Sequence, residues 1–250
     1  MNRLALNDDW EVRYEDLSWG PDMHEEAAAQ TERWMSVALP CDIHMPLIES
    51  GEIPEPLVKD HSFAGEWTER KSWWFKKTFR PEDHVLQASR AELVLESLDA
   101  EADIFLNGRP LGHHRSAFYP FRADVRKLLV PGDNTLLVRL SSGVEYYSER
   151  DLARFKDRVG MENKHNRGER GRVFVRKPQY VFGWDWGPRV VTCGIVGDCY
   201  LEAHGPFAIR GVRAVTERIR ERSGYDGTPS QDADVRFEVE IEQFHPFATA

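Results

Sequence analysis

The sequence of 250 residues lacks several features that define other classes of protein. It has three cysteines, Cys41, Cys193 and Cys199, and their irregular spacing gives neither a disulfide framework nor a zinc-binding pattern. No run of about 18 apolar residues occurs, and the N-terminus has no apolar segment of signal-peptide length. We therefore expect buried, reduced thiols in a cytoplasmic protein that does not associate with membranes.

Positive charge is also in short supply. The 33 Lys and Arg residues are outnumbered by 42 Asp and Glu residues, for a formal net charge of −9. This balance disfavours a general nucleic-acid surface. His113 and His114 have no partner ligands at useful spacing, so we expect no metal site there and no cofactor.

Aromatic residues, in contrast, are abundant, and one stretch combines them with an acid. Residues 179–190 read QYVFGWDWGPRV and place Asp185 between Trp184 and Trp186. An indole offers a flat apolar face, and a carboxylate accepts hydrogen bonds from hydroxyl groups, each worth about 1.5–3 kcal/mol when charge-assisted. Because a sugar ring has both an apolar C–H face and hydroxyls, we take Trp184 and Asp185 as candidate substrate-binding residues.

An alternative is that Asp185 is a turn residue that accepts hydrogen bonds from backbone N–H groups. In a regular strand, Trp184 and Trp186 would share one face and Asp185 would lie on the other. Joint contact of Trp184 and Asp185 with one sugar therefore requires a bulge or turn, which Gly183 and Gly187 permit. Trp186 is then expected to lie in the core.

Short strands separated by turns dominate the rest of the chain. Strands are predicted at 72–79, 91–97, 102–106 and 135–140. Asn107-Gly108 supplies the positive φ angles of a tight hairpin. This pattern predicts an antiparallel jelly-roll β-sandwich; the alternative is an α+β domain with a long helix over 143–160. Residues 144–177 mix both charge signs and are interpreted as a solvated loop or helix.

The chain changes character after His204-Gly205-Pro206, which reads as a linker. Strands are predicted at 207–215 and 235–242, joined by a polar loop over 222–234. Two strands cannot close a core by themselves. We therefore divide the chain into residues 1–205, the sandwich, and residues 206–250, the start of a second domain that has been cut short.

Three stretches together resemble a known family. Residues 176–195 (RKPQYVFGWDWGPRVVTCGI), 95–112 and 40–56 are similar to the N-terminal sugar-binding domain of β-mannosidases in glycoside hydrolase family 2. The resemblance implies a galactose-binding-domain-like jelly roll, then an immunoglobulin-like sandwich beginning near Phe207, then a (β/α)8 barrel. Two residues depart from the family pattern, Cys41 in place of Gly and Ser116 in place of Asn.

The resemblance also implies a function. Retaining hydrolysis of terminal β-mannose uses two glutamates on the barrel, for which these 250 residues have no counterpart, so no catalytic residue is assigned. Trp184 and Asp185 match the positions that contact the terminal sugar. The expected partners are a terminal β-mannoside or related carbohydrate and the catalytic barrel of the parent chain. The alternatives are a free-standing carbohydrate-binding module, the same domain of a β-galactosidase- or β-glucuronidase-type enzyme, or a structural domain.

Overall fold

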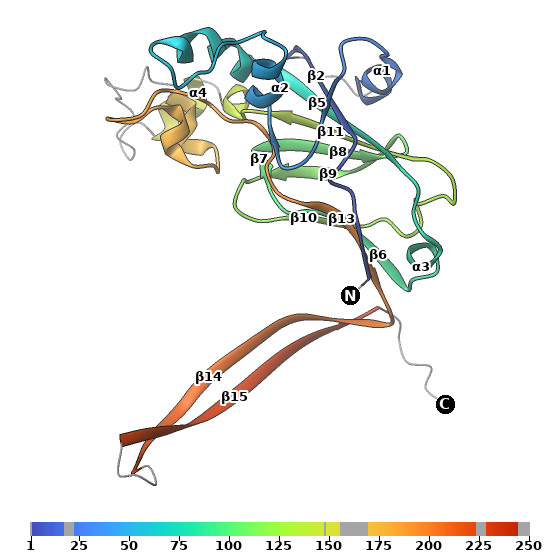
Figure 1. Ribbon diagram of the computed structural model, residues 1–250, viewed down its shortest axis with the longest axis vertical. Helices are drawn as coiled ribbons and strands as arrows, with labels where there is room; N and C mark the ends of the chain where they lie inside the picture. Colours follow the sequence, from blue (N-terminus) through green and yellow to red (C-terminus); the bar gives the residue numbers. More distant parts are fainter. Residues whose placement is uncertain (1, 18–22, 148, 156–169, 224–228, 245–250) are drawn as a thin grey trace.

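The computed structural model describes residues 2–17, 23–147, 149–155, 170–223 and 229–244 (Figure 1). Two antiparallel sheets face each other. The smaller has the strand order β1-β13-β6-β10 and the larger β3-β2-β5-β11-β8-β9. The strands are β1 (Asn2–Ala5), β2 (Trp10–Asp16), β3 (Met35–Val37), β5 (Lys71–Phe79), β6 (Arg90–Leu95), β8 (Glu101–Leu106), β9 (Arg109–Arg115), β10 (Phe121–Asp124), β11 (Asn134–Ser141) and β13 (Cys199–His204).

The core lies between these two sheets. Alternation along β5 sends Trp73 and Phe75 inward, where they join one cluster of buried apolar side chains with Leu93 of β6 and Leu201 of β13. Trp74 points to the opposite face of the larger sheet, where it packs with other side chains beneath α1 (Met23–Ala29). The jelly-roll sandwich predicted from the strand pattern is therefore confirmed.

Smaller elements close the end of the sandwich where residues 170–195 lie. A short sheet pairs β12 (Gly194–Ile195) with β4 (Cys41–Asp42) and β7 (Leu98–Asp99). Besides α1, the helical segments in the described residues are α2 (His44–Glu49), η1 (His61–Arg70), α3 (Asp83–Leu86), η2 (Val144–Tyr146), α4 (Glu149–Phe155), η3 (Arg170–Phe174) and η4 (Gln179–Phe182). Across the described ranges, no helix has the length and apolar character needed to span a membrane.

The long helix of the α+β alternative is not found in the described residues. Over 143–147 and 149–155 the chain forms η2, then an extended residue at Tyr147, then α4. Residues 156–169, which belong to the mixed-charge segment, lie outside the described residues. The Asn107-Gly108 turn is confirmed, since both residues have positive φ (52° and 73°) and connect β8 to β9.

The chain ends in a hairpin that extends away from the sandwich (Figure 1). Its strands are β14 (Phe207–Ser223) and β15 (Pro229–Gln243), which pair with each other in a separate sheet. Both are longer than predicted, because the polar residues expected to form a loop over 222–234 continue the ladder. Residues 224–228, in the middle of that predicted loop, lie outside the described part of the chain.

Candidate functional site

The Trp-Asp-Trp stretch forms a tight turn at the surface. Trp184 N donates to Gly187 O at 3.3 Å, and Gly187 N donates to Trp184 O at 3.2 Å. These two bonds leave Asp185 and Trp186 as the central residues of a two-residue hairpin turn, which we call the tryptophan turn (residues 184–187). The turn is the departure from strand geometry that joint contact of Trp184 and Asp185 with one ligand requires.

The side chains of the turn face solvent. Trp184 is 43% exposed and Trp186 84% exposed, and their rings meet edge to face with centroids 5.9 Å apart. The expectation that Trp186 belongs to the core is therefore wrong. In a strand it would share the inner face with Trp184, but as a central residue of a tight turn it projects from the surface.

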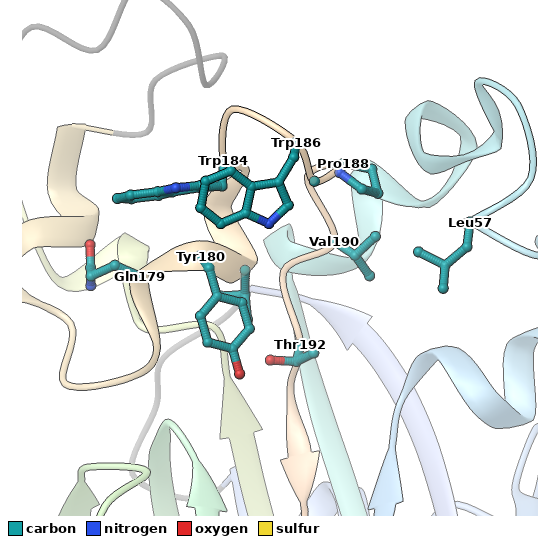
Figure 2. Close-up of a pocket in the computed structure, with 10 residues that line it drawn as sticks. Leu57, Gln179, Tyr180, Trp184, Trp186, Pro188, Val190 and Thr192 are labelled. Carbon is teal, nitrogen blue, oxygen red and sulfur yellow. The ribbon is translucent and has the colours of Figure 1, made fainter.

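A cavity of about 700 Å³ lies beside the turn (Figure 2). Trp184 and Trp186 lie at its upper end in this view, Tyr180 lies below them, and Leu57 lies across from them. The walls are mostly apolar; their residues are Leu57, Gln179, Tyr180, Val181, Trp184, Trp186, Gly187, Pro188, Val190 and Thr192. Flat aromatic surface beside an open cavity can bind the C–H face of a sugar or the apolar surface of another domain.

Asp185 lies at the tip of the turn rather than among the residues that line this cavity. Its side chain is exposed. In the part of the chain that the structure describes, no protein group donates a hydrogen bond to its carboxylate. The described residues therefore do not form the alternative arrangement, in which Asp185 accepts hydrogen bonds from backbone amides. The carboxylate oxygens of Asp185 remain open to a ligand.

Sequence reasoning missed the buried ions beneath the turn. Lys177, which was included in the solvated mixed-charge segment, is only 2% exposed and forms an ion pair with Asp99. Arg189 forms a second buried ion pair, with Glu69. The apolar residues that line the cavity beside the turn were also missed. Tyr180 stands in the same stretch of sequence as the turn, and its 65% exposure is unusual for an aromatic residue next to a buried valine.

His113 belongs to an ion-pair network on β8 and β9 and does not form part of a metal site. Its Nδ1 lies 2.7 Å from Asp103 Oδ1 and its Nε2 lies 3.0 Å from Glu101 Oε2. Hydrogen bonds to Asp103 and then to Glu101 raise the pKa of His113 to about 9, against the opposing effect of burial. Both ring nitrogens are engaged, so a neutral imidazole lone pair is not available to a metal ion.

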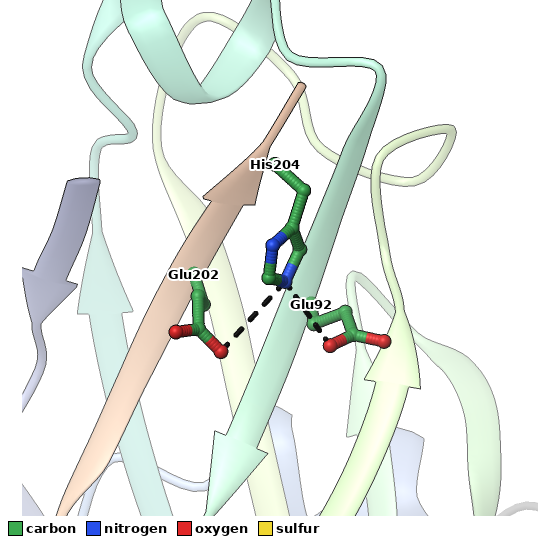
Figure 3. A group of neighbouring side chains, drawn as sticks. All are labelled: Glu92, Glu202 and His204. Carbon is green, nitrogen blue, oxygen red and sulfur yellow. Dashed lines mark hydrogen bonds and ion pairs between the residues drawn. The ribbon is translucent and has the colours of Figure 1, made fainter. Parts of the chain in front are cut away.

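Glu92, Glu202 and His204 form the grouping in the described residues that best resembles a metal site (Figure 3). His204 Nε2 lies 3.2 Å from Glu92 Oε2 and 3.7 Å from Glu202 Oε2. The two carboxylates face each other across the β6–β13 pair, and guanidinium groups surround them; these come from Arg3, Arg90, Arg122 and Arg210. Four cations around two carboxylates oppose the binding of a further cation, so the grouping serves as an ion-pair network.

The three cysteines are buried thiols, as predicted. Burial raises the pKa of Cys41 to about 12. Cys41, which the resemblance sets at a glycine position, pairs with Ile195 in regular register. The thiolate is the reactive form of cysteine, so none of these residues is suited to nucleophilic catalysis.

Comparison with known proteins places this architecture in a family. Residues 19–197 match the pattern of the glycosyl hydrolase 2 galactose-binding domain-like family, and the chain belongs to that family. It is 30% identical to β-mannosidase B of Aspergillus niger over 193 residues, which cover 75% of this chain and 22% of that protein. It is 28% identical to β-mannosidase B of Aspergillus fumigatus over 235 residues, covering 92% of this chain and 26% of that protein.

Solved structures agree with this assignment. The crystal structure of a β-D-mannosidase from Dictyoglomus thermophilum matches with a TM-score of 0.76 and 28% identity, over 97% of this chain and 26% of that one. A β-glucuronidase from Bifidobacterium dentium matches with a TM-score of 0.62 at 16% identity, which shows a shared fold. The chain thus spans about a quarter of the length of these relatives and corresponds to their N-terminal portion.

Proposed function

We propose that this chain is the non-catalytic front portion of a β-mannosidase-like retaining glycoside hydrolase. In this proposal it contributes Trp184 and Asp185 to the terminal-sugar subsite of a catalytic barrel that follows in the same polypeptide. The observation that carries the proposal is the exposed tryptophan turn, with a free carboxylate at its tip and an apolar cavity at its side. Trp184 would stack on the sugar ring, and Asp185 would accept hydrogen bonds from its hydroxyls.

The geometry of the turn requires that another part of the protein complete the sugar site. One tryptophan and one carboxylate on a turn cover only part of a pyranose, whereas sites for small ligands bury most of the ligand surface. A second protein surface is therefore needed to complete the site. The exposed apolar side chains beside the turn suit the docking of such a surface, because contiguous apolar patches mark interaction sites.

The hairpin supports a continuation of the chain beyond the sandwich. One face of it is apolar and uncovered; its members include Ile209, Val212, Phe237, Val239 and Ile241, all at least 50% exposed. Register shifts between Ile209 and Gly211 and between Thr216 and Arg218 keep the apolar residues of β14 opposite those of β15. Since a two-stranded ribbon is marginal alone, we propose that residues 206–250 begin an immunoglobulin-like domain whose remaining strands cover this face.

The proposal is tested by removing the carboxylate. In the protein that joins this chain to a barrel, Asp185→Ala should lower kcat/KM for an aryl β-mannoside by about 10–100-fold, the equivalent of one charge-assisted hydrogen bond. Asp8→Ala removes an exposed carboxylate elsewhere and serves as the control. Wild-type kinetics in Asp185→Ala, or turnover by the purified 250-residue chain alone, would contradict the proposal.

A free-standing carbohydrate-binding module is the second candidate, because the aromatic turn and its cavity are accessible without another domain. It predicts binding of a methyl β-mannoside by the isolated chain, measured by titration calorimetry. Partial coverage of the sugar leads us to expect a Kd of about 1 mM or weaker. Submillimolar binding that is lost in Trp184→Ala would favour this candidate.

A further inference from the structure

Two buried cations flank the segment that presents the tryptophan turn, one where the segment leaves the sandwich and one where it returns. Lys177 stands just before η4, and Arg189 stands two residues after Gly187. Between them Val181, Phe182 and Gly183 are buried, and Val190 N donates to Val181 O at 3.1 Å to close the stem. The exposed turn therefore sits on a narrow stem, which is attached to the sandwich at the two cations.

The first cation is bonded to β7. Lys177 Nζ lies 2.8 Å from Asp99 Oδ1 and also donates to the carbonyl of Thr192. Thr192 Oγ1 in turn donates to Asp99 Oδ2 at 2.5 Å. Asp99 thus engages the chain on both sides of the stem. Its own exposure is 4%, and the Lys177 side chain is fully buried.

The second cation is bonded to η1. Arg189 Nη2 lies 2.5 Å from Glu69 Oε2, and Arg189 Nη1 donates to Phe182 O at 3.4 Å. The Phe182 ring lies near both cations, with its centroid 5.6 Å from the Arg189 guanidinium and 5.8 Å from the Lys177 ammonium. A third cation, Arg172, is close enough for the charge of Arg189 to lower its pKa in addition to the larger effect of burial. Removal of the Glu69 charge would leave the buried Arg189 without its ion-pair partner, while Lys177 would keep Asp99.

We propose that Glu69 and Asp99 are positioning residues that set the direction of the tryptophan turn through Arg189 and Lys177. The inference rests on the proposed function, since it assigns these acids to the presentation of Trp184 and Asp185. Buried ion pairs add little net stability compared with apolar residues of similar volume, but each requires a defined geometry. The two pairs come from separate elements, so together they define both the position and the rotation of the stem.

The experiment uses the 250-residue chain labelled with 5-fluorotryptophan and observed by ¹⁹F NMR. Substitutions Trp184→Phe and Trp186→Phe assign the two turn signals, and the buried Trp10 gives an internal reference. The test variants are Glu69→Gln, Asp99→Asn and the apolar pair Glu69→Leu with Arg189→Met. The matched control is Asp133→Asn, which breaks the exposed Arg80–Asp133 ion pair; Arg80 follows the end of β5, whereas Glu69 precedes its start.

The double variant Glu69→Leu with Arg189→Met separates an effect on the position of the tryptophan turn from an effect on the stability of the fold. We expect its melting temperature to stay near that of the wild type, because an apolar pair can replace a buried ion pair at little cost. The Trp184 and Trp186 signals should nevertheless shift by more than their line widths or change width, while the Trp10 signal stays in place. Asp133→Asn should change none of the three signals.

Unchanged turn signals in the folded double variant and in Asp99→Asn would overturn the positioning role. That outcome is independent of the kinetic result for Asp185→Ala, which tests the proposed function. Shifted turn signals together with wild-type kinetics in Asp185→Ala would support the positioning role of Glu69 and Asp99 but contradict the role of the turn in sugar binding.

Discussion

Arg210 donates one hydrogen bond to each oxygen of the Glu92 carboxylate, Nη1 to Oε2 and Nη2 to Oε1, both at 2.8 Å. Arg210 lies on β14 and Glu92 on β6, so this bidentate pair joins the terminal hairpin to the sandwich. The same guanidinium donates from Nε to Glu242 on β15 at 2.6 Å. One arginine therefore connects both strands of the hairpin to the smaller sheet.

Substitution of this arginine should loosen the hairpin. Burial alone would raise the pKa of Glu92, but the hydrogen bonds and charge of Arg210 and the charges of Arg90 and His204 lower it. Without Arg210 the buried carboxylate loses its best partner, and we expect Arg210→Met to cost about 1.5–3 kcal/mol in urea unfolding. Arg213→Met, which removes an exposed ion pair on the same strand, should stay within about 0.5 kcal/mol. Equal effects of the two substitutions would contradict this role.

The His113 network predicts a loss of stability at alkaline pH. The folded-state pKa of about 9 lies above the ordinary value of 6.5, so the network stabilises the fold fully below pH 6.5. This contribution should then disappear as the pH rises to about 9. Because the side chain is 35% exposed, solvent screening reduces it to about 1–2 kcal/mol. Urea titrations of the wild type between pH 6 and 9.5 should show the decline, which His113→Gln should flatten and the control His61→Gln should retain.

Much of the sandwich could be predicted because its signals are local. Alternation along 72–79 places Trp73 and Phe75 on one face, and Asn107-Gly108 adopts the positive φ angles that its residue types tolerate. Trp186 could not be placed in the same way. Its exposure depends on whether the backbone runs straight or turns at Asp185, and the two glycines allow both.

The ion pairs beneath the turn could not be predicted for a different reason. Glu69 and Arg189 are 120 residues apart in the sequence, and Lys177 meets an aspartate on a strand far upstream. In the sequence, Lys177 stands among residues of both charge signs, a pattern typical of a solvated face. Burial of such charges is decided by tertiary contacts with distant partners, which a single sequence does not display.

Gly194 allows an unusually close approach of two strands. A Cβ atom at this position would lie 2.1 Å from the carbonyl oxygen of Cys41, a backbone atom that cannot move aside without breaking the β4–β12 pair. We expect Gly194→Ala to lower the free energy of unfolding by about 3 kcal/mol or more. Gly132→Ala is the control, since a Cβ there would meet nothing within 4 Å. If Gly194→Ala were as stable in urea as Gly132→Ala, the Cys41 carbonyl would not lie close enough to residue 194 to exclude a Cβ atom.

Side-chain truncation should lower the free energy of unfolding strongly in the stem and hardly at all in the tryptophan turn. Phe182 is fully buried near Lys177 and Arg189, so Phe182→Ala should cost about 3–5 kcal/mol. Trp186 is 84% exposed and packs edge to face on Trp184, so Trp186→Ala should stay within about 0.5 kcal/mol. Urea unfolding followed by circular dichroism avoids the change in fluorescence that loss of an indole causes. A cost for Trp186→Ala close to that of Phe182→Ala would mean that the turn packs into the core, and the open site beside it would not exist.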